Sequence, residues 1–534
     1  MRIRRPAVVA LAVLLLPAAV LVALRPLALG AQFRGLTTIG SVAEDRLRLR
    51  QLADSAPTAG FLIRSARTLS APGDRARHAF VALPEVDVRW NDRVPLALND
   101  GAMWSGRGAN ALVRAGAYFS NRWLSIVLAP EVTVSRNLGF EVFPGREPGR
   151  SAWSSPWHTG GHSADLPLRF GDRALTLTSP GQSSLTIEAG PIALGASSEN
   201  QWWGPGVRNA LLLSTQAAGV PHLFVRSARP LRSRAGDVEF RAIAGGLTES
   251  IFFDTIPSND FRSLSGVIVT LTPRAAPHLT VGVARLVVAP ARAKGSVLAG
   301  ALNAFTRWRP AGDPRTRADS LAGDQLTSLF GRWIFPKDRF ELWFEWAKSE
   351  LPRSLRELII APHNAQGYTL GFQWALPARG SRATVRVQAE ATNVEQSVVF
   401  AERPPADFYT GRAAPQGFTQ RGQLLGASVG PGGQGQWLAA DYLVPGWSLG
   451  LMLQRIRWED GALYREPIPN FFRHDVTLLA GLRATLRTGA YDYSASIATN
   501  RRLNYLFQNG IANPAGRRTV DVPNLTLTLS ASPR

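Results

Sequence analysis

Residues 474–487 read HDVTLLAGLRATLR, and this stretch decides the fold class. Apolar residues recur at every second position between polar or small ones: Val476, Leu478, Ala480, Leu482 and Leu486 against Asp475, Thr477, Gly481, Arg483 and Arg487. A period of two is typical of a strand with one apolar and one polar face. The run is also longer than most strands of soluble domains, so it predicts a strand that crosses a membrane.

The same alternation recurs from about Ala111 onward, at 340–346, 384–390, 447–454 and 524–530. Beyond the N-terminus no stretch approaches the roughly 20 apolar residues that a spanning helix needs. Lipid offers backbone groups no partner, so a membrane chain without such helices must form a closed barrel. The 424 residues of 111–534 would make roughly 16 to 20 spanning strands. We therefore predict an antiparallel transmembrane β-barrel over 111–534.

Features near the strand ends agree with a barrel, with one exception. Aromatic residues recur where an interfacial girdle is expected, at Trp123, Trp308, Trp333, Tyr368, Trp374 and Trp458. Longer polar insertions predict extracellular loops at 145–165, 290–325, 350–366 and 401–421. The exception is the final stretch, Ser530 to Arg534, which lacks the aromatic residue that closes many outer-membrane barrels.

The N-terminal residues predict export. Basic Arg2, Arg4 and Arg5 precede an apolar run from Ala7 to Leu24, and small residues suit cleavage before Ala31. Residues 1–30 are therefore interpreted as a signal peptide, with an uncleaved membrane anchor as the alternative. Residues 31–110 are expected to form a periplasmic helical bundle, or plug, and a connector, with two short helices at 41–69 broken at Pro57. The absence of cysteine excludes a lipid-anchored N-terminus, disulfides and thiol metal sites.

The charge points to an anionic partner. The formal net charge is +21, and removal of residues 1–30 leaves about +17. Most of it is arginine, spaced singly along the expected strands and not in the runs or patches that bind nucleic acid. Since guanidinium groups pair with carboxylates and phosphates, we expect an acidic polymer or an anionic lipid as partner, and no nucleic acid. The alternative is that the arginines are solvated or extend to the membrane interface.

The strongest recognition signal lies at 199–230, ENQWWGPGVRNALLLSTQAAGVPHLFVRSARP. Tryptophan faces stack on sugar rings, and nearby arginine and asparagine can bind uronic-acid carboxylates. The candidate polysaccharide-binding residues are Trp202, Trp203, Arg208, Asn209, Arg226 and Arg229. In the alternative interpretation, the two tryptophans fill the lumen or belong to a girdle.

This segment closely resembles the Wzi-type capsule-assembly proteins of the bacterial outer membrane, and 41–69, 367–374 and 422–458 are also similar to that family. The resemblance implies an eighteen-stranded barrel with a small helical bundle at its periplasmic mouth. It also implies a lectin-like, non-enzymatic protein that holds capsular or related exopolysaccharide at the cell surface. We expect an all-β fold of about 18 strands with an N-terminal α-helical plug, located in the outer membrane as a monomer among its lipids.

Other functions find less support in the residues. His158, His162 and Asp165 lie in a loop and not on a helix face, so we expect no metal site. Glu341 and Glu345 would lie about 13 Å apart on one strand face, farther than the roughly 5–9.5 Å of glycosidase carboxylates. We therefore expect no enzyme and no cofactor. A porin for small or anionic solutes and a secreted glycan-processing enzyme are the rival hypotheses.

Overall fold

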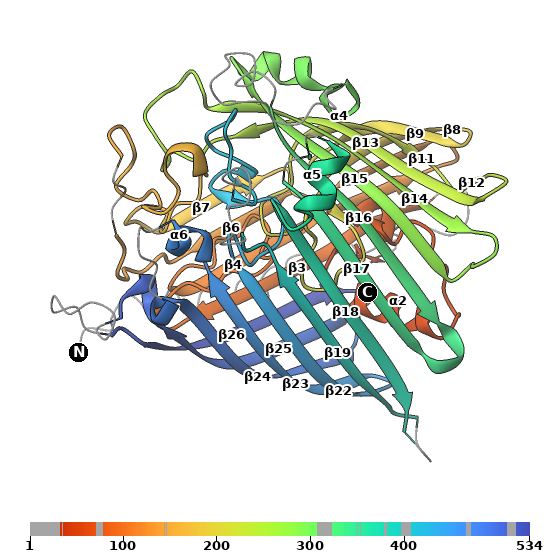
Figure 1. The fold of residues 1–534 in the computed structure, drawn as a ribbon. Helices are drawn as coiled ribbons and strands as arrows, with labels where there is room; N and C mark the ends of the chain where they lie inside the picture. The colour runs from red at the N-terminus through yellow and green to blue at the C-terminus, as the bar shows by residue number, and fades with distance from the viewer. Residues whose placement is uncertain are drawn as a thin grey trace.

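A computed structural model of the chain describes residues 33–34, 36–70, 78–143, 145, 147–306, 323–349, 351–352, 354–378, 382–396, 407–465, 471–509 and 519–534. The signal peptide expected at 1–30 lies outside these ranges. The described residues form a closed antiparallel β-barrel of 18 strands with several segments folded into its lumen (Figure 1). The predicted fold class is confirmed.

The wall follows the order of the chain, and three of its positions are made of two strands in succession. The strands are β3 (His78–Asn91), β4 (Gly108–Ser120), β5 (Leu124–Leu128) with β6 (Glu131–Ser135), β7 (Leu175–Ser179) with β8 (Ser184–Ala189), β9 (Ile192–Ser197), β11 (His222–Ser227) with β12 (Leu231–Arg232), β13 (Gly236–Thr248), β14 (Phe261–Pro273), β15 (Leu279–Ala291), β16 (Asp324–Phe335), β17 (Phe340–Lys348), β18 (Gln366–Pro377), β19 (Thr384–Asn393), β22 (Gln434–Val444), β23 (Trp447–Trp458), β24 (Asp475–Thr488), β25 (Tyr491–Leu503) and β26 (Val522–Pro533). The last strand pairs with the first, with Leu529 opposite Val88, so the wall has no free edge.

The alternation seen in the sequence sorts side chains between lipid and lumen. In β24, Leu478, Leu482 and Leu486 are exposed on the outside, whereas Asp475 and Thr477 are buried inside. The expected start of the barrel at residue 111 has to be corrected, because β3 and the first residues of β4 precede it. A register shift between Ala82 and Glu85 interrupts the period of two in β3, which is why the pattern did not reveal this strand.

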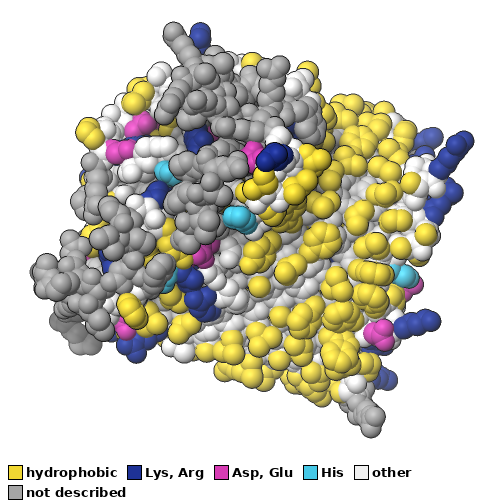
Figure 2. Space-filling model, in the orientation of Figure 1, with side chains coloured by type: hydrophobic (Ala, Val, Ile, Leu, Met, Phe, Trp, Pro, Cys, Tyr) yellow, Lys and Arg dark blue, Asp and Glu magenta, His cyan; other side chains and the backbone are white. Residues whose placement is uncertain are grey.

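An apolar belt covers the outside of the wall, and basic side chains lie along one edge of it (Figure 2). Trp123, Trp333 and Trp374 are exposed beside short turns, as expected for a girdle. Trp458 instead donates a hydrogen bond to Thr477, a buried residue, so it belongs to the inner side. Trp308 lies outside the described residues.

The two ends of the barrel differ in loop length and in charge. Short turns join the strands at one end, which marks it as the periplasmic end. Exposed basic residues gather at that end: Arg122, Arg229, Arg232, Arg234, Arg274, Lys337, Arg382, Arg487 and Arg534. The four insertions expected to be extracellular all follow strands at the other, long-loop end. Part of the last one, 407–421, turns inward, since Phe408, Tyr409 and Phe418 are fully buried.

Segments far apart in the sequence fill the lumen. Its main apolar core joins inward-facing wall residues to Leu211, Leu212 and Leu213 of the 198–221 segment and to Tyr409 and Phe418. The luminal elements are α2 (Val42–Leu52), β2 (Ile63–Arg64), α3 (Ala66–Leu69), β10 (Trp202–Trp203), β20 (Thr419–Gln420) and β21 (Gln423–Leu424). We call these elements and their connections the plug.

The N-terminal part of the plug only partly matches the two expected helices. Helix α2 is present, with the Ser41 side chain accepting a bond from the Glu44 amide at its start. The prediction of a second helix is wrong at 61–64, because Ile63 and Arg64 form a strand that pairs with the 202–203 strand. Consecutive apolar residues at 61–63 are all buried, which a strand between two layers allows and a surface helix does not.

The remaining described elements are short. They are β1 (Phe33–Arg34), which runs parallel to β3, α4 (Asn303–Thr306), α5 (Leu355–Ile360), α6 (Asp460–Tyr464) and the 3-10 turns η2 (Gly160–His162), η3 (Lys294–Gly300), η4 (Pro336–Asp338), η5 (Phe471–Arg473) and η6 (Tyr505–Phe507). Among the described helices, none has the length and apolar character to cross a membrane.

The outward face of the wall can be tested at Leu451, which is 61% exposed in the middle of β23. Replacing it with arginine should lower the free energy of unfolding by about 2–4 kcal/mol, because the charge would face hydrocarbon. Reversible unfolding in lipid vesicles measures this, with Leu451→Ala as the uncharged control. Equal stability of the two variants would contradict the assignment of this face to lipid.

Candidate functional site

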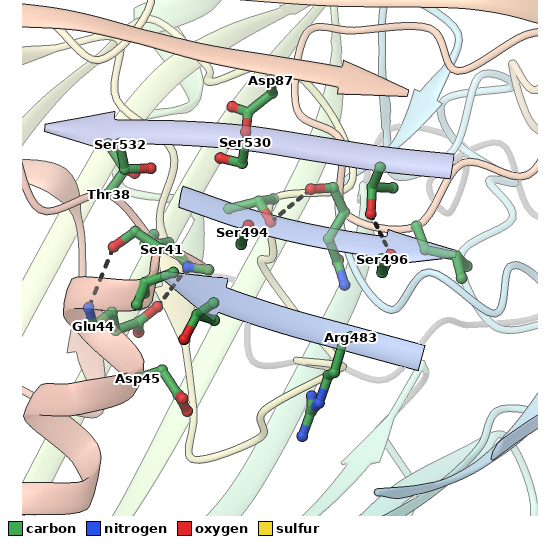
Figure 3. A pocket seen from close by; sticks show the side chains of 18 of the residues that line it. Thr38, Ser41, Glu44, Asp45, Asp87, Arg483, Ser494, Ser496, Ser530 and Ser532 are labelled. Carbon is green, nitrogen blue, oxygen red and sulfur yellow. Dashed lines mark hydrogen bonds between the residues drawn. The ribbon is translucent and has the colours of Figure 1, made fainter. Parts of the chain in front are cut away.

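A cavity of about 600 Å³, lined by both polar and apolar side chains, lies in the lumen between α2 and the inner faces of β22 to β26 and β3. It reaches from Val444 and Trp447 at the periplasmic end to Gln388 and Trp437 deeper in the barrel. Figure 3 shows Ser494 and Ser496 on one strand and Ser530 and Ser532 on the next, lining the cavity wall across from the helix that carries Glu44 and Asp45. Hydroxyl groups both donate and accept hydrogen bonds, so this wall suits a hydroxylated or hydrated ligand.

Alternating charges attach α2 to the wall beside the cavity. Arg386 of β19 binds Asp45 at 2.7 Å and Asp441 at 2.9 Å. Arg483 of β24 also binds Asp441, at 2.5 Å, and remains partly exposed to the cavity. Burial would raise the pKa of Asp45, but the charge and hydrogen bonds of Arg386 outweigh burial and hold the pKa below its ordinary value. The carboxylate is therefore ionised at neutral pH, and the attachment is intact there.

A second set of ion pairs fixes α2 and β2 from the opposite side. Glu341 of β17 accepts bonds from Arg48 at 2.5 Å and from Arg332 at 2.6 Å. Arg64 binds Glu44 at 2.7 Å and the carbonyl of Gly206 at 2.8 Å. Arg48, Arg64 and Arg332 are buried and committed to carboxylates of the same chain, so these three cations do not face an acidic partner.

The two tryptophans of the 199–230 segment have different surroundings. Trp203 is 0% exposed in the main core, and its ring lies close enough to Gly266 of β14 to exclude any side chain there. Trp202 is 3% exposed, borders the cavity and has the Arg64 guanidinium 5.0 Å from its ring centroid. Gly204 follows with a φ of 117°, a conformation that favours glycine. The segment thus makes a fixed turn against the wall.

A single wall carboxylate organises the next residues. Glu390 of β19 accepts backbone N–H bonds from Val207 at 2.6 Å, Arg208 at 3.1 Å and Asn209 at 2.8 Å. The Asn209 side-chain oxygen accepts bonds from the amide and hydroxyl of Ser428, so Asn209 ties the plug segments together. Arg208 extends to the cavity, where it and Arg483 lie over the Trp437 ring, 5.4 and 5.3 Å from its centroid.

The last two predicted site residues lie away from the cavity. Arg226 of β11 makes its contacts with Glu188, at 3.5 Å, and with the carbonyl of Ser227. Arg229 is exposed in the connection between β11 and β12 at the periplasmic end. Of the six candidates, the structure therefore brings Trp202 and Arg208 to one cavity and separates the other four from it.

The role of Glu390 gives a first prediction for the site. Glu390→Ala should leave three backbone donors unpaired, that of Asn209 in a buried position, and destabilise the plug by about 2–4 kcal/mol. Hydrogen exchange at 207–209, followed by mass spectrometry on the membrane-inserted protein, should report faster exchange. Glu390→Gln keeps one acceptor oxygen and should give an intermediate rate. Unchanged exchange in both variants would show that this carboxylate does not order the segment.

A second candidate surface lies at the long-loop end, and we call Trp157, His158, His162, Asp407, Glu459 and Arg465 the mouth cluster. Arg465 forms an ion pair with Asp407 and donates to the Trp157 carbonyl at 2.6 Å. His162 lies 3.3 Å from Asp407, and His158 lies 3.0 Å from Glu459. Trp157 packs edge-on against Phe507. The cluster combines a partly exposed cation with an aromatic ring, as sugar-binding surfaces do.

The three residues weighed as metal ligands have separate partners. His158 and His162 contact the two acids just named, whereas both oxygens of Asp165 accept bonds from Ser250, at 2.6 and 2.7 Å. Burial and the charge of Arg465 lower the pKa of His162 to about 4, so its ring is neutral at pH 7. Within the described ranges, no three His, Asp or Glu side chains are grouped as metal ligands would be.

Comparison with known proteins identifies the family of this chain. The family model described as capsule assembly protein Wzi matches residues 95–469, which is more than half of the chain. The chain belongs to the Wzi capsule assembly family. The matched range contains the 198–221 and 407–429 plug segments and most of the wall, whereas the N-terminal part of the plug, with α2, β2 and α3, precedes it.

A solved structure of the family agrees on the fold of this Wzi-family chain. Wzi of Escherichia coli, described as an outer-membrane, carbohydrate-binding β-barrel involved in group 1 capsule assembly, has a TM-score of 0.53 and 12% identity, covering 84% of this chain and 83% of its own. OprB of Pseudomonas putida (TM-score 0.36, 11% identity, coverage 86% and 94%) and OccK5 of Pseudomonas aeruginosa (0.35, 11%, 87% and 100%) are more distant. No curated protein sequence matches this chain significantly.

Sequence reasoning missed several residues that build the site of this Wzi-family chain. Asp45, Arg386, Asp441 and Arg483 are paired across four different elements. Their inward positions could be read from the alternation on each strand, but their pairing depends on which strands face α2 across the lumen. No local pattern in the sequence shows which strands lie opposite α2.

Loop packing at the mouth predicts a pH effect. Burial raises the pKa of Asp165 to about 6 despite its bonds to Ser250, so the packed state of the loops around Asp165 and Ser250 favours the protonated acid. The stability that this proton gives the packed loops is fully present below about pH 4 and should fall by about 3 kcal/mol as pH rises through 6. Hydrogen exchange at 249–253, corrected for intrinsic rates, should quicken between pH 4 and pH 7. Asp165→Asn should remove this dependence, and a pH profile identical to wild type would contradict the assignment.

Proposed function

We propose that this protein is a non-enzymatic, lectin-like barrel of the outer membrane that holds capsular or related exopolysaccharide at the cell surface. The observation that carries the proposal is the Wzi family match over a barrel whose lumen is filled by segments of the matched range. The Escherichia coli structure described as a carbohydrate-binding barrel supports the ligand class. Export by residues 1–30 and a monomeric state among outer-membrane lipids belong to the same proposal.

The state of the acidic groups supports a binding role over catalysis. Glu341 and Glu345, weighed as a glycosidase pair, are both buried in the lumen. Glu341 is engaged by two arginines, and Glu345 accepts a bond from the Leu211 amide at 3.0 Å. Their oxygens hold the plug in place, so they serve the fold.

The filled lumen also favours a binding protein over a porin. Loops that fold inward in porins leave an aqueous channel. In this barrel the inward-folded segments pack into an apolar core, in which Trp203, Leu211, Tyr409 and Phe418 are fully or almost fully buried. Planar-bilayer recordings separate the hypotheses. We expect no steady porin-sized conductance from the inserted protein, and a stable open channel would favour the porin.

The mouth cluster is the position we propose for the polymer, because the long-loop end faces the outside. Arg465 supplies a cation there, since burial lowers its pKa only to about 10. Among the described residues, Arg93, Arg173, Arg356 and Arg501 are also exposed at the long-loop end and support an acidic polymer, while the periplasmic end carries the larger number of exposed basic residues. The cavity is the second position, favoured by its hydroxyl groups and by Trp202 and Arg208, with Trp203 and Asn209 positioning them. Arg226 and Arg229 lie too far from either position to share it.

Binding to the source organism's extracellular polysaccharide tests ligand and position together. Arg465→Ala should weaken binding about tenfold if a charge-assisted bond is lost, and the carboxyl-reduced polymer should bind wild type equally weakly. Arg208→Ala, in the cavity, is the matched arginine control and should leave affinity unchanged. Weakening by Arg208→Ala alone would move the site to the cavity. Absence of binding to either polymer would overturn the proposed function.

A further inference from the structure

The outer wall of the barrel carries an apolar groove that the lumen and the mouth cluster do not involve. Its volume is about 660 Å³, and its floor is formed by outward-facing side chains of five adjacent wall strands: Ile126, Leu128, Leu185, Ala196, Leu223 and Ala244. Leu128, Leu185 and Leu223 are about half exposed there. The floor is continuous with the apolar belt, so the medium that reaches it is lipid.

A loop segment covers the upper end of this groove. Residues 292–304, with η3 and the start of α4, fold back from the top of β15 over the outside of the wall (Figure 1). Val297 and Leu298 line the groove. Val297 packs on Gly246 of β13 so closely that a larger residue there would displace it. We call this segment the flap.

Polar bonds hold the underside of the flap to outward-facing wall residues. Ser265 of β14 donates to the carbonyl of Ala301 at 2.8 Å and accepts from the amide of Ala304 at 3.1 Å. Arg285 of β15 donates to the carbonyl of Ala304 at 2.8 Å and to Gln325 at 2.7 Å. Arg285 pairs with Val267 on the face opposite the core residues Leu264 and Leu286, so it belongs to the outer side. A lipid-facing arginine is costly, and the flap offsets that cost by covering it.

The upper side of the flap has the opposite character. Leu302 is 65% exposed and Phe305, directly after the flap, is 45% exposed, although both lie at the outside of a membrane barrel. The flap therefore presents polar groups to the wall and apolar groups to the surroundings. In a water-soluble protein the apolar groups would face the wall and the polar groups would face outward. The reverse arrangement is expected where the surroundings are acyl chains and not water.

Two cationic side chains at the start of the flap indicate which kind of lipid would bind there. Arg292 and Lys294 are both exposed at the long-loop end, and the 292–306 stretch contains no acidic residue. The extracellular interface lies at this height, where cationic side chains pair with phosphate. The groove is lined at one end by Val297 and Leu298 of the flap, and the flap itself begins at these two exposed cations, a combination that fits an acyl chain attached to a phosphorylated headgroup.

We propose that the groove and the flap bind one acylated, phosphorylated glycolipid of the outer leaflet, with an acyl chain against Leu223 and Ala244 and a phosphate at Arg292 and Lys294. The glycolipid would hold the flap on the wall and so keep Arg285 covered. The proposal rests on the outer-membrane placement given above and does not depend on polysaccharide recognition.

Native mass spectrometry of the detergent-solubilised full chain with purified lipid A tests this site. A one-to-one adduct should form with wild type and should be at least about tenfold more abundant than with phosphatidylethanolamine. Ala244→Trp fills the groove and should abolish the preference. Ala440→Trp is the matched control, because Ala440 is an exposed alanine on the outer face of β22, and the preference should persist in it.

A double substitution separates the phosphate contact from the fold. Arg292→Glu with Lys294→Glu changes only exposed loop residues, and a heat-modifiable gel shift verifies that the barrel is folded. We expect loss of the preference for lipid A and retention of polysaccharide binding. Equal adducts with both lipids in wild type, or a preference that survives both the Ala244→Trp and the double variant, would overturn the glycolipid site while leaving the proposed function intact.

Discussion

The whole molecule follows from one constraint: in lipid, every backbone N–H and C=O of the wall must find its partner within the wall. β26 satisfies it by pairing with β3, which closes the sheet. Closure creates an inside that lipid cannot reach, and alternation then assigns every second residue to it. Polar residues gather there because the outer face is reserved for apolar ones, as β24 shows.

A closed wall of this size leaves a wide lumen, and the chain fills it with its own loops. Long loops bring unpaired backbone groups with them, which need acceptors and donors from the wall. Glu390 provides acceptors for three consecutive amides, and Glu345 for a fourth. Inward-facing carboxylates thus do for the plug what neighbouring strands do for each other. Glu341 is buried in the same lumen, and the cost of burying its charge explains why Arg332 pairs with it so closely.

Sequence patterns predicted the repeated strands of the wall and missed the contacts between residues that lie far apart in the chain. Alternation predicted the wall, its approximate strand number and its two faces, because each strand carries that information by itself. It failed for β3, where a register shift breaks the period, and for Ile63, whose strand partner Trp203 lies 140 residues away. The candidate site was predicted with less success for the same reason. Trp202 and Arg208 border the cavity, but Asp45 and Arg483 reach it from elements that no local pattern connects.

Arginine illustrates how composition can mislead about function. The excess suggested an acidic polymer or an anionic lipid as partner, with solvated or interfacial arginines as the alternative, and the structure divides the arginines by position. Arg48, Arg64 and Arg386 neutralise luminal acids, while exposed arginines at the short turns meet the periplasmic membrane interface, where phosphates are the available anions. Arg285 is a third kind, facing outward beneath a flap. The net charge of a barrel is therefore a sum over lumen, interface and mouth. A polymer bound at the mouth, as we propose, would therefore meet only the part of this charge that lies at the long-loop end.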